Sequence, residues 1–155
     1  MNVKNQAIKV VATNRKAYHN FNIEEPFEAG IALTGTEIKS IRDGKASITD
    51  AYVKPEGGSL WLVNAHIARY EPGSYMSHEP ARSRRLLMHR KQINLLAGRV
   101  QERGLTLVPL RIYLKGGLAK VEIALAKGKK LYDKREAIAE RDSDREIERA
   151  VKRRV

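Results

Sequence analysis

Residues 118–135, LAKVEIALAKGKKLYDKR, contain the change of pattern that most constrains how this chain can fold. In the first half, Val121, Ile123 and Leu125 alternate with residues of another kind, a period of two that is typical of a strand with one buried face. The second half has no such period and is strongly basic around Gly128. The last core strand is therefore expected to continue into a charged segment.

This change of pattern divides the chain into a folded body, residues 1–126, and a basic C-terminal tail, residues 127–155. The tail is rich in Ala, Glu, Arg and Lys, which favour helix, but its apolar stripe is thin. An isolated helix of this kind is marginal in water. We therefore expect a tail that is disordered when free and helical once an anionic partner binds it.

The charge of the chain indicates its class of partner. The 155 residues carry a formal net charge of +12 at pH 7, with a pI near 10.1. Such an excess favours nucleic acid or an anionic membrane as partner, and an inert basic surface is the alternative. No secretory signal is visible, and the apolar runs are far shorter than the roughly 20 residues of a membrane span. We expect a cytoplasmic protein with no membrane partner.

The body is predicted to be mainly β. Helices are expected at residues 27–33 and 89–103, with a single helical turn at 48–51. Strands are expected at residues 18–23, 36–42, 51–54, 60–67, 105–115 and 118–126. Five or six short antiparallel strands with so little helix favour a small closed barrel, and the Greek-key type that binds oligonucleotides (the OB type) suits the strand count and the charge.

Several single residues refine this expectation. Residues 1–13 fit either a frayed arm or an added edge strand. Pro109 cannot donate to a strand ladder and implies an edge or a bulge, and Gly104 is placed to end the second helix. Glu28 falls near the start of the first expected helix, where an acidic residue is stabilising. For Trp61, packing in the core or at the barrel end is favoured over a base-stacking role.

No catalytic or metal-binding motif is present. The chain has no cysteine, which excludes disulfides, thiolate zinc sites and cysteine nucleophiles. Its four histidines form no HExxH pattern, and Gly128-Lys129 lacks the preceding glycine of a phosphate-binding P-loop. We therefore expect a binding protein rather than an enzyme, with no metal and no cofactor.

Two basic clusters are candidates for RNA contact. Arg15 lies close to Tyr18 and His19, and a basic residue beside aromatic rings can hold phosphate and stack on a base. A solvated turn explains this stretch equally well. Arg84 and Arg85 belong to a second cluster, which follows a long irregular segment.

Four stretches together resemble the small protein B (SmpB) family, the transfer-messenger RNA (tmRNA)-binding proteins of bacteria. They are Asn14-Arg15 with His19, FEAGIALTGTEIKSIRDGKASITDAYV at 27–53, ARSRRLLMHRKQINLL at 81–96, and RVQERGLTLVPLRIYLKGGLAKVEIALAKGKKLYDKR at 99–135. The resemblance implies an oligonucleotide-binding barrel and a role in trans-translation, in which tmRNA is delivered to ribosomes stalled without a stop codon. It also implies that protein and tmRNA together mimic a complete tRNA.

The resemblance implies particular contact residues as well. Glu28, Leu87 and Lys120 match family positions implicated in RNA contact, and His89 occupies a fourth such position, where the family often has Asn. With Arg15, His19, Arg84 and Arg85 they form the expected tmRNA-binding set. The tail residues expected to engage the ribosome are Gly128, Lys129, Lys130, Tyr132, Asp133, Lys134 and Arg135.

The implied partners are the tRNA-like domain of tmRNA, the small-subunit decoding region and mRNA channel of the ribosome, and elongation factor Tu on the charged tmRNA. The protein is expected to be a monomer. Two other functions compete with this one: a general binder of single-stranded nucleic acid that uses the same barrel, and an enzyme that acts on RNA, for which the sequence offers no catalytic set.

Overall fold

The computed structural model describes residues 7–70 and 78–129, and the structural findings refer to this part of the chain. Its helices are α1 (Arg15–Asn20), α2 (Gly35–Arg42) and α3 (Arg90–Arg103). Its strands are β1 (Ile8–Thr13), β2 (Phe21–Ile31), β3 (Ala46–Ser47), β4 (Tyr52–Glu56), β5 (Ser59–Val63), β6 (His66–Ile67), β7 (Arg84–Leu87), β8 (Thr106–Lys115) and β9 (Leu118–Gly128).

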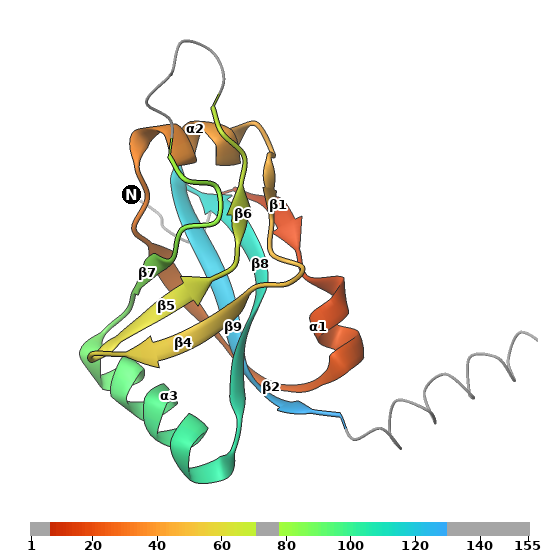
Figure 1. The fold of residues 1–155 in the computed structure, drawn as a ribbon, viewed down its shortest axis with the longest axis vertical. Helices are drawn as coiled ribbons and strands as arrows, with labels where there is room; N and C mark the ends of the chain where they lie inside the picture. The colour runs from red at the N-terminus through yellow and green to blue at the C-terminus, as the bar shows by residue number, and fades with distance from the viewer. Residues whose placement is uncertain (1–6, 71–77, 130–155) are drawn as a thin grey trace, which may run out of the picture.

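The main sheet closes on itself. Its strands follow the order β1-β8-β4-β5-β7-β2-β9, and β9 pairs again with β8, so the strands from β8 round to β9 form a ring (Figure 1). All of these pairings are antiparallel. A second, small sheet joins β3 to β6, and α2 contacts β6. The mainly β class and the closed antiparallel arrangement predicted from the sequence are confirmed.

The core lies inside this ring. Alternate residues of β5, β7, β8 and β9 point inward, and α2 and α3 contribute Ile41 and Leu96. The alternation predicted for β9 is confirmed, because Val121, Ile123 and Leu125 are fully buried. Ala124 and Ala126, on the other face of the strand, are also buried, in a smaller apolar cluster to which α1 contributes. A short helix thus covers part of the outside of the ring.

The helix predicted at residues 27–33 is wrong, because the chain there belongs to strand β2, which runs to Ile31. Phe27 and Ile31 face inward in either conformation, since a spacing of four fits both a strand and a helix. The buried Ala29 between them distinguishes the two, because it adds the period of two. Pro26 does not begin a helix but lies at a register shift between β2 and β9, where a missing N–H is tolerated.

The strand predicted at residues 36–42 is also wrong, because α2 occupies this segment. Thr34 caps the helix: its hydroxyl accepts from the N–H of Glu37 at 3.3 Å, while its own N–H donates to the Glu37 carboxylate at 2.9 Å. This capping box satisfies two donors at the helix start. The buried residues Glu37, Ser40 and Ile41 then follow at helical spacing.

The strand predicted at residues 18–23 begins only at Phe21, because residues 15–20 form α1. Asn14 starts this helix by accepting a hydrogen bond from the N–H of Ala17 at 3.1 Å. The helical turn predicted at residues 48–51 is a single hydrogen-bonded turn, closed from Ala51 to Ile48. Residues 8–13 form β1 on the edge of β8, which is the added edge strand rather than the frayed arm.

The strands predicted at residues 105–115 and 118–126 form a hairpin as β8 and β9, and those predicted at 51–54 and 60–67 form another as β4 and β5, except that β5 ends at Val63 and residues 66–67 belong to β6. Strands β4 and β5 are joined by Gly57 and Gly58, and both glycines have the positive φ that this tight turn requires. Strand β8 pairs with β9 from Thr106 to Lys115, with a register shift just after Pro109. Helix α3 ends at Gly104 in the left-handed conformation, as predicted. Within residues 7–70 and 78–129, no helix has the length and apolar character needed to cross a membrane.

Candidate nucleic-acid interface

Four of the residues expected to bind RNA lie together around one hollow on the outside of the ring. Glu28 comes from β2, Leu87 from β7, His89 from the start of α3 and Lys120 from β9. We call this the Glu28 hollow, and its lining is completed by Gly30, Met88 and Gln92. The ring therefore brings together side chains that are up to 92 positions apart (120 − 28 = 92) in the sequence.

Gly30 explains how the hollow is built. Strand β2 lies between β7 and β9, and Gly30 pairs with Leu87 on one side and with Lys120 on the other. A Cβ atom at position 30 would lie 3.2 Å from the Cβ of Leu87, so a side chain there would crowd Leu87. Glycine therefore leaves space between an apolar and a basic neighbour. Leu87 remains 51% exposed, which makes it available to a ligand.

The Glu28 carboxylate is fixed by contacts from β8. The Tyr113 hydroxyl donates a short hydrogen bond to it, and Lys115 Nζ lies 3.5 Å from the same oxygen. The hydrogen bond from Tyr113 is the main reason that the pKa of Glu28 is lowered; partial burial opposes it, and Lys115 and Lys120 add to the lowering. Glu28 is thus an ionised hydrogen-bond acceptor held in one position. The helix-start role considered for it is excluded, since it lies in a strand.

Tyr113 was not identified from the sequence. Its side chain is 2% exposed, and burial, followed by the bond to Glu28, raises the pKa of its hydroxyl. The Arg111 guanidinium lies 4.9 Å from the centre of the Tyr113 ring and pairs with Glu122 at 3.1 Å. The alternation of Arg111, Tyr113 and Lys115 on β8 was the available signal, but it became informative only once β9 was known to lie between β8 and β2, the strand of Glu28.

Arg15 and His19 lie elsewhere, on α1 beside the end of β9. Phe21 pairs with Gly128, and the N–H of Lys129 donates to the carbonyl of Asn20 at 3.0 Å. Eight residues of β9 separate Gly128 from Lys120 (128 − 120 = 8), which corresponds to about 26 Å of strand. The root of the tail and α1 therefore form a second region, distant from the Glu28 hollow.

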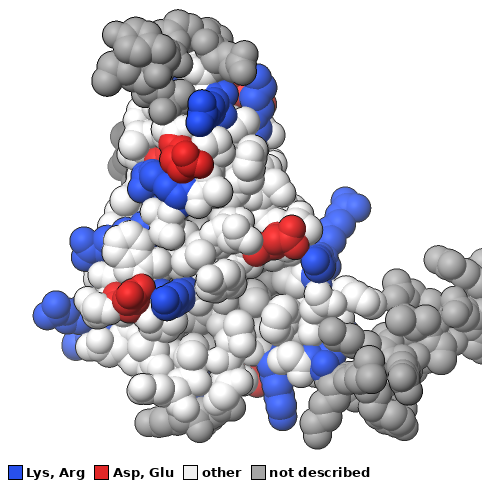
Figure 2. Space-filling model, viewed as in Figure 1, with Lys and Arg blue, Asp and Glu red and all other residues white. Residues whose placement is uncertain are grey.

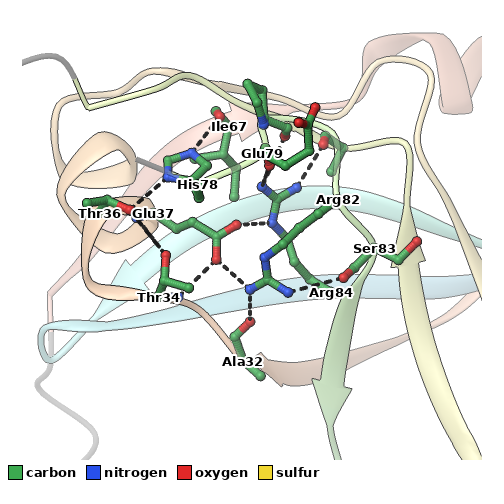
Figure 3. Close-up of polar contacts among 12 residues, drawn as sticks. Ala32, Thr34, Thr36, Glu37, Ile67, His78, Glu79, Arg82, Ser83 and Arg84 are labelled. Atoms are coloured by element: carbon green, nitrogen blue, oxygen red, sulfur yellow. Dashed lines mark hydrogen bonds and ion pairs between the residues drawn. The ribbon is translucent and has the colours of Figure 1, made fainter. Parts of the chain in front are cut away.

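Arg84 and Arg85 point to opposite sides of β7. Arg85 is exposed, whereas Arg84 is fully buried and its guanidinium contacts the Glu37 carboxylate at 2.5 Å and the carbonyl of Ala65 at 2.9 Å. Figure 3 shows that Arg82 approaches the other oxygen of Glu37. In this position the Arg84 side chain is inaccessible to RNA, because alternation along the strand turns it inward. Its role is structural.

The Glu37 cluster joins α2 to the segment before β7. Burial opposes ionisation of Glu37, but hydrogen bonds from Arg82, the Thr34 N–H and Arg84 outweigh it and lower the pKa of Glu37. Beside the cluster, the His78 ring contacts the Thr36 hydroxyl at 2.9 Å and the Ile67 carbonyl at 2.8 Å (Figure 3). These contacts fix the start of β7 and so the position of Leu87, three residues after Arg84.

The expected tail residues are only partly described. Gly128 is the last residue of β9 and is paired with Phe21, so the strand runs two residues further than predicted. Lys129 follows it. The remaining ones lie outside the described residues: Lys130, Tyr132, Asp133, Lys134 and Arg135. In the described part of the chain, no group of three or more histidine and carboxylate side chains is arranged to hold a metal ion.

Comparison with known proteins gives consistent matches. The family model described as "SmpB protein" matches residues 11–153. A protein of Dehalococcoides mccartyi named "SsrA-binding protein" is 62% identical over 142 residues, which are 92% of this chain and 83% of the relative. A protein of Pelotomaculum thermopropionicum with the same name is 57% identical over 149 residues, 96% of this chain and 97% of the relative.

A solved structure gives the same result. A chain in the structure described as "tmRNA-SmpB: a journey to the center of the bacterial ribosome" superimposes with a TM-score of 0.67 at 48% identity. The match covers 81% of this chain and 92% of that one. Both the sequence and the fold of the chain are therefore similar to those of proteins described as SmpB or SsrA-binding protein.

Proposed function

The chain belongs to the SmpB family, and we propose on that basis that it binds tmRNA in trans-translation through the Glu28 hollow. The observation that carries the proposal is the convergence of Glu28, Leu87, His89 and Lys120 on one hollow, although they come from four different parts of the chain. The hollow offers a fixed anion, a cation, an exposed apolar side chain and a ring with hydrogen-bonding nitrogens.

Each of these groups has a distinct use toward folded RNA. Lys120 can hold a phosphate, which supplies affinity without a sequence code. Glu28 repels phosphate but can accept a hydrogen bond from a base edge or a ribose hydroxyl. Leu87 can pack against the face of a base, and a His89 nitrogen can donate where many relatives have an amide. The set is suited to a folded RNA that is read by shape, as expected for a tRNA-like domain.

Substitution of Glu28 tests this site. Glu28→Ala should weaken binding of the tRNA-like domain of tmRNA by about tenfold or more at fixed salt, since a hydrogen bond to a charged group contributes about 1.5–3 kcal/mol. Glu24→Ala is the matched control, because Glu24 is an exposed carboxylate on the same strand outside the hollow. Equal RNA affinities of the two variants, measured by filter binding or fluorescence anisotropy, would show that Glu28 does not contribute to RNA binding.

Competition separates this function from a general single-strand binder. A tRNA-like RNA should displace labelled tmRNA at a far lower concentration than unstructured DNA of equal length, because Glu28 and Leu87 need a folded surface. Comparable displacement by both would favour the general binder. We propose no catalytic activity, and incubation of RNA with the protein and Mg²⁺ should leave the RNA uncleaved.

The division of roles between body and tail is also proposed. The body binds tmRNA, and the tail from Gly128 onward engages the small-subunit decoding region and mRNA channel of the stalled ribosome. Arg15 and His19 remain proposed RNA contacts, and their place beside the root of the tail makes them available to the tail's partner as well. Elongation factor Tu is expected on the charged tmRNA together with this protein, which gel-shift assays with all three components would detect.

The protein is expected to bind as a monomer. Light scattering should then give the mass of a single chain for the free protein and a one-to-one complex with the RNA. A dimeric mass would contradict this part of the proposal.

A further inference from the structure

The outer surface that begins at the Glu28 hollow continues across β7 onto the neighbouring strands β5 and β4. Arg85 and Leu87 both point outward on β7, and Leu87 already belongs to the hollow. Trp61 on β5 pairs directly with Arg85, and Lys54 on β4 pairs directly with Trp61. Lys54, Trp61 and Arg85 therefore form one row across three strands that begins next to the hollow.

Trp61 is not a core residue. The burial pattern of β5 alternates, with Leu60 and Leu62 fully buried and Trp61 half-buried on the outer face. Packing in the core, one of the two packing roles favoured for Trp61 from the sequence, is therefore wrong, because the register of β5 turns Trp61 away from the ring interior. Its indole N–H donates only a long bond, 3.4 Å, to the Glu56 carbonyl at the turn of the hairpin.

A concave surface surrounds Trp61. The hollow there is lined by Tyr52, Lys54, Glu56, Gly57, Ser59, Trp61, Val63 and Ser83. We call the outward residues Tyr52, Lys54, Trp61, Val63, Ser83 and Arg85 the Trp61 face. Tyr52 is 45% exposed, so a second aromatic ring is available two residues from Lys54. In Figure 2 the surface over β4 and β5 is mostly uncharged apart from an acidic and a basic side chain next to each other, and further basic side chains lie on the side of β7.

The charges on the Trp61 face favour a polyanion at its border. Within the described residues no acidic side chain pairs with Arg85, while Lys54 has one exposed contact, 3.5 Å from Glu56. An exposed pair at this distance is weak and can exchange for a phosphate. Aromatic rings flanked by cations form the platform on which unpaired bases stack while their phosphates are neutralised.

We propose that the Trp61 face is a second contact surface for the same RNA and binds an unpaired stretch of it by stacking a base on Trp61 between Lys54 and Arg85. The inference rests on the proposed function, since it continues the surface that begins at the Glu28 hollow. A paired helix does not fit this role, because its bases are already stacked and only its backbone and groove edges are exposed.

Trp61 is the single tryptophan of the chain, so its fluorescence reports on this face without labelling. Titration of the full-length protein with the tRNA-like domain of tmRNA should quench the emission through stacking. Trp61→Leu should weaken binding by about 5- to 150-fold, the range for loss of one stacked base. Trp61→Phe should lose less, and Leu95→Ala, which removes another exposed apolar side chain on α3, should bind normally.

The outcomes distinguish this inference from the proposed function. Normal binding by Trp61→Leu, with emission unchanged at saturating RNA, would overturn it even if Glu28→Ala weakens binding. Quenching by isolated small ribosomal subunits but not by the tRNA-like RNA would overturn the choice of partner. Quenching of Trp61 emission by the tRNA-like RNA, together with normal RNA binding by Glu28→Ala, would support the Trp61 face as an RNA contact and contradict that role for the Glu28 hollow.

Discussion

Glu28 shows how one residue acquires a role through its neighbours. An isolated carboxylate on a basic surface repels phosphate, and the local sequence pattern suggested only a helix-start function for Glu28, whereas the family resemblance implied an RNA contact. The structure supplies Tyr113, whose buried hydroxyl bonds to the carboxylate and whose ring lies under Arg111. Tyr113 thus acts as a positioning residue for Glu28, because it fixes one oxygen and leaves the other free to accept.

Tyr113→Phe tests whether the hydrogen bond from Tyr113 controls the pKa of Glu28. The hydrogen bond from Tyr113 is the largest cause of the lowered pKa of Glu28, so its removal should raise that pKa toward the ordinary value of 4.5. NMR titration of the Glu28 carboxyl carbon would measure the change. The variant should also lose about 1 kcal/mol of unfolding free energy, after allowance for the partial exposure of Glu28. An unchanged titration midpoint would show that Tyr113 does not control the charge of Glu28.

A double-mutant cycle measures the effect of Tyr113 on binding. If Tyr113 acts only through Glu28, Tyr113→Phe should weaken RNA binding less than Glu28→Ala does, and the double variant should bind like Glu28→Ala alone. Additive losses would instead assign Tyr113 a separate contact with the RNA.

At the scale of elements, the Glu37 cluster determines where β7 begins. Glu37 lies on α2, and its two oxygens receive the guanidinium groups of Arg82 and Arg84, which lie on either side of the start of β7. The same carboxylate accepts from the N–H of Thr34 in the capping box. One buried anion therefore caps a helix and fixes a strand, and Leu87 and Arg85 on that strand belong to the two proposed contact surfaces.

Glu37→Gln should therefore destabilise the whole body. Removal of the charge leaves the Arg84 guanidinium buried without its counterion, which costs about 3–5 kcal/mol in comparable buried pairs. Glu25→Gln is the matched control, because Glu25 forms only a 3.4 Å pair with Arg99 at the surface, and it should cost less than about 1 kcal/mol. Urea unfolding measures both. Similar midpoints for the two variants would contradict a structural role for the cluster.

Glu37 also contributes to the pH dependence of stability. Because the pKa of Glu37 is lower in the folded protein than its ordinary 4.5, its ionised form stabilises the fold. That contribution is complete above the ordinary pKa and is lost as the pH falls through the lowered, folded-state value. The wild-type protein should therefore lose stability on acidification below about pH 4.5, and Glu37→Gln should lose less over the same interval.

At the scale of the whole molecule, β2 and β9 separate two regions. Their paired strands carry Glu28 and Lys120 toward one end, and at the other end Phe21 and Gly128 hold the root of the tail beside α1. An element this long and this fully paired is rigid compared with a linker. The proposed tmRNA surface and the departure point of the tail are thus kept apart along the strand, at about 26 Å.

A truncation after Lys129 tests this separation of roles. It keeps the pairing of Gly128 and the bond from Lys129 to Asn20, so the body should unfold at nearly the same urea concentration as the full chain. Binding of the tRNA-like RNA should fall only slightly, while rescue of stalled ribosomes in a reconstituted translation assay should be abolished. Strong loss of RNA binding in the truncated protein would place tmRNA contacts in the tail.

The sequence by itself determined the features that depend on local pattern. The alternation in β9, the helix at α3 with Gly104 at its end and the bulge near Pro109 were all readable, because each depends on neighbours within a few residues. The family resemblance selected Glu28, Leu87, His89 and Lys120. Patterns that satisfy two periods at once were ambiguous, which is why residues 27–33 and 36–42 were assigned to the wrong type of element.

The tertiary structure decided which side of each strand faces the ring and which strands are neighbours. Alternation places Arg84 and Arg85 on opposite faces but does not say which one is inside, and that choice depends on Glu37, 47 residues away in the sequence. The pairing of β2 with β9 brought Glu28 near Tyr113 on β8, the other neighbour of β9, and the register of β5 turned Trp61 outward. These features arise from long-range pairing and burial, so the positions of the contact surfaces depend on the closed ring.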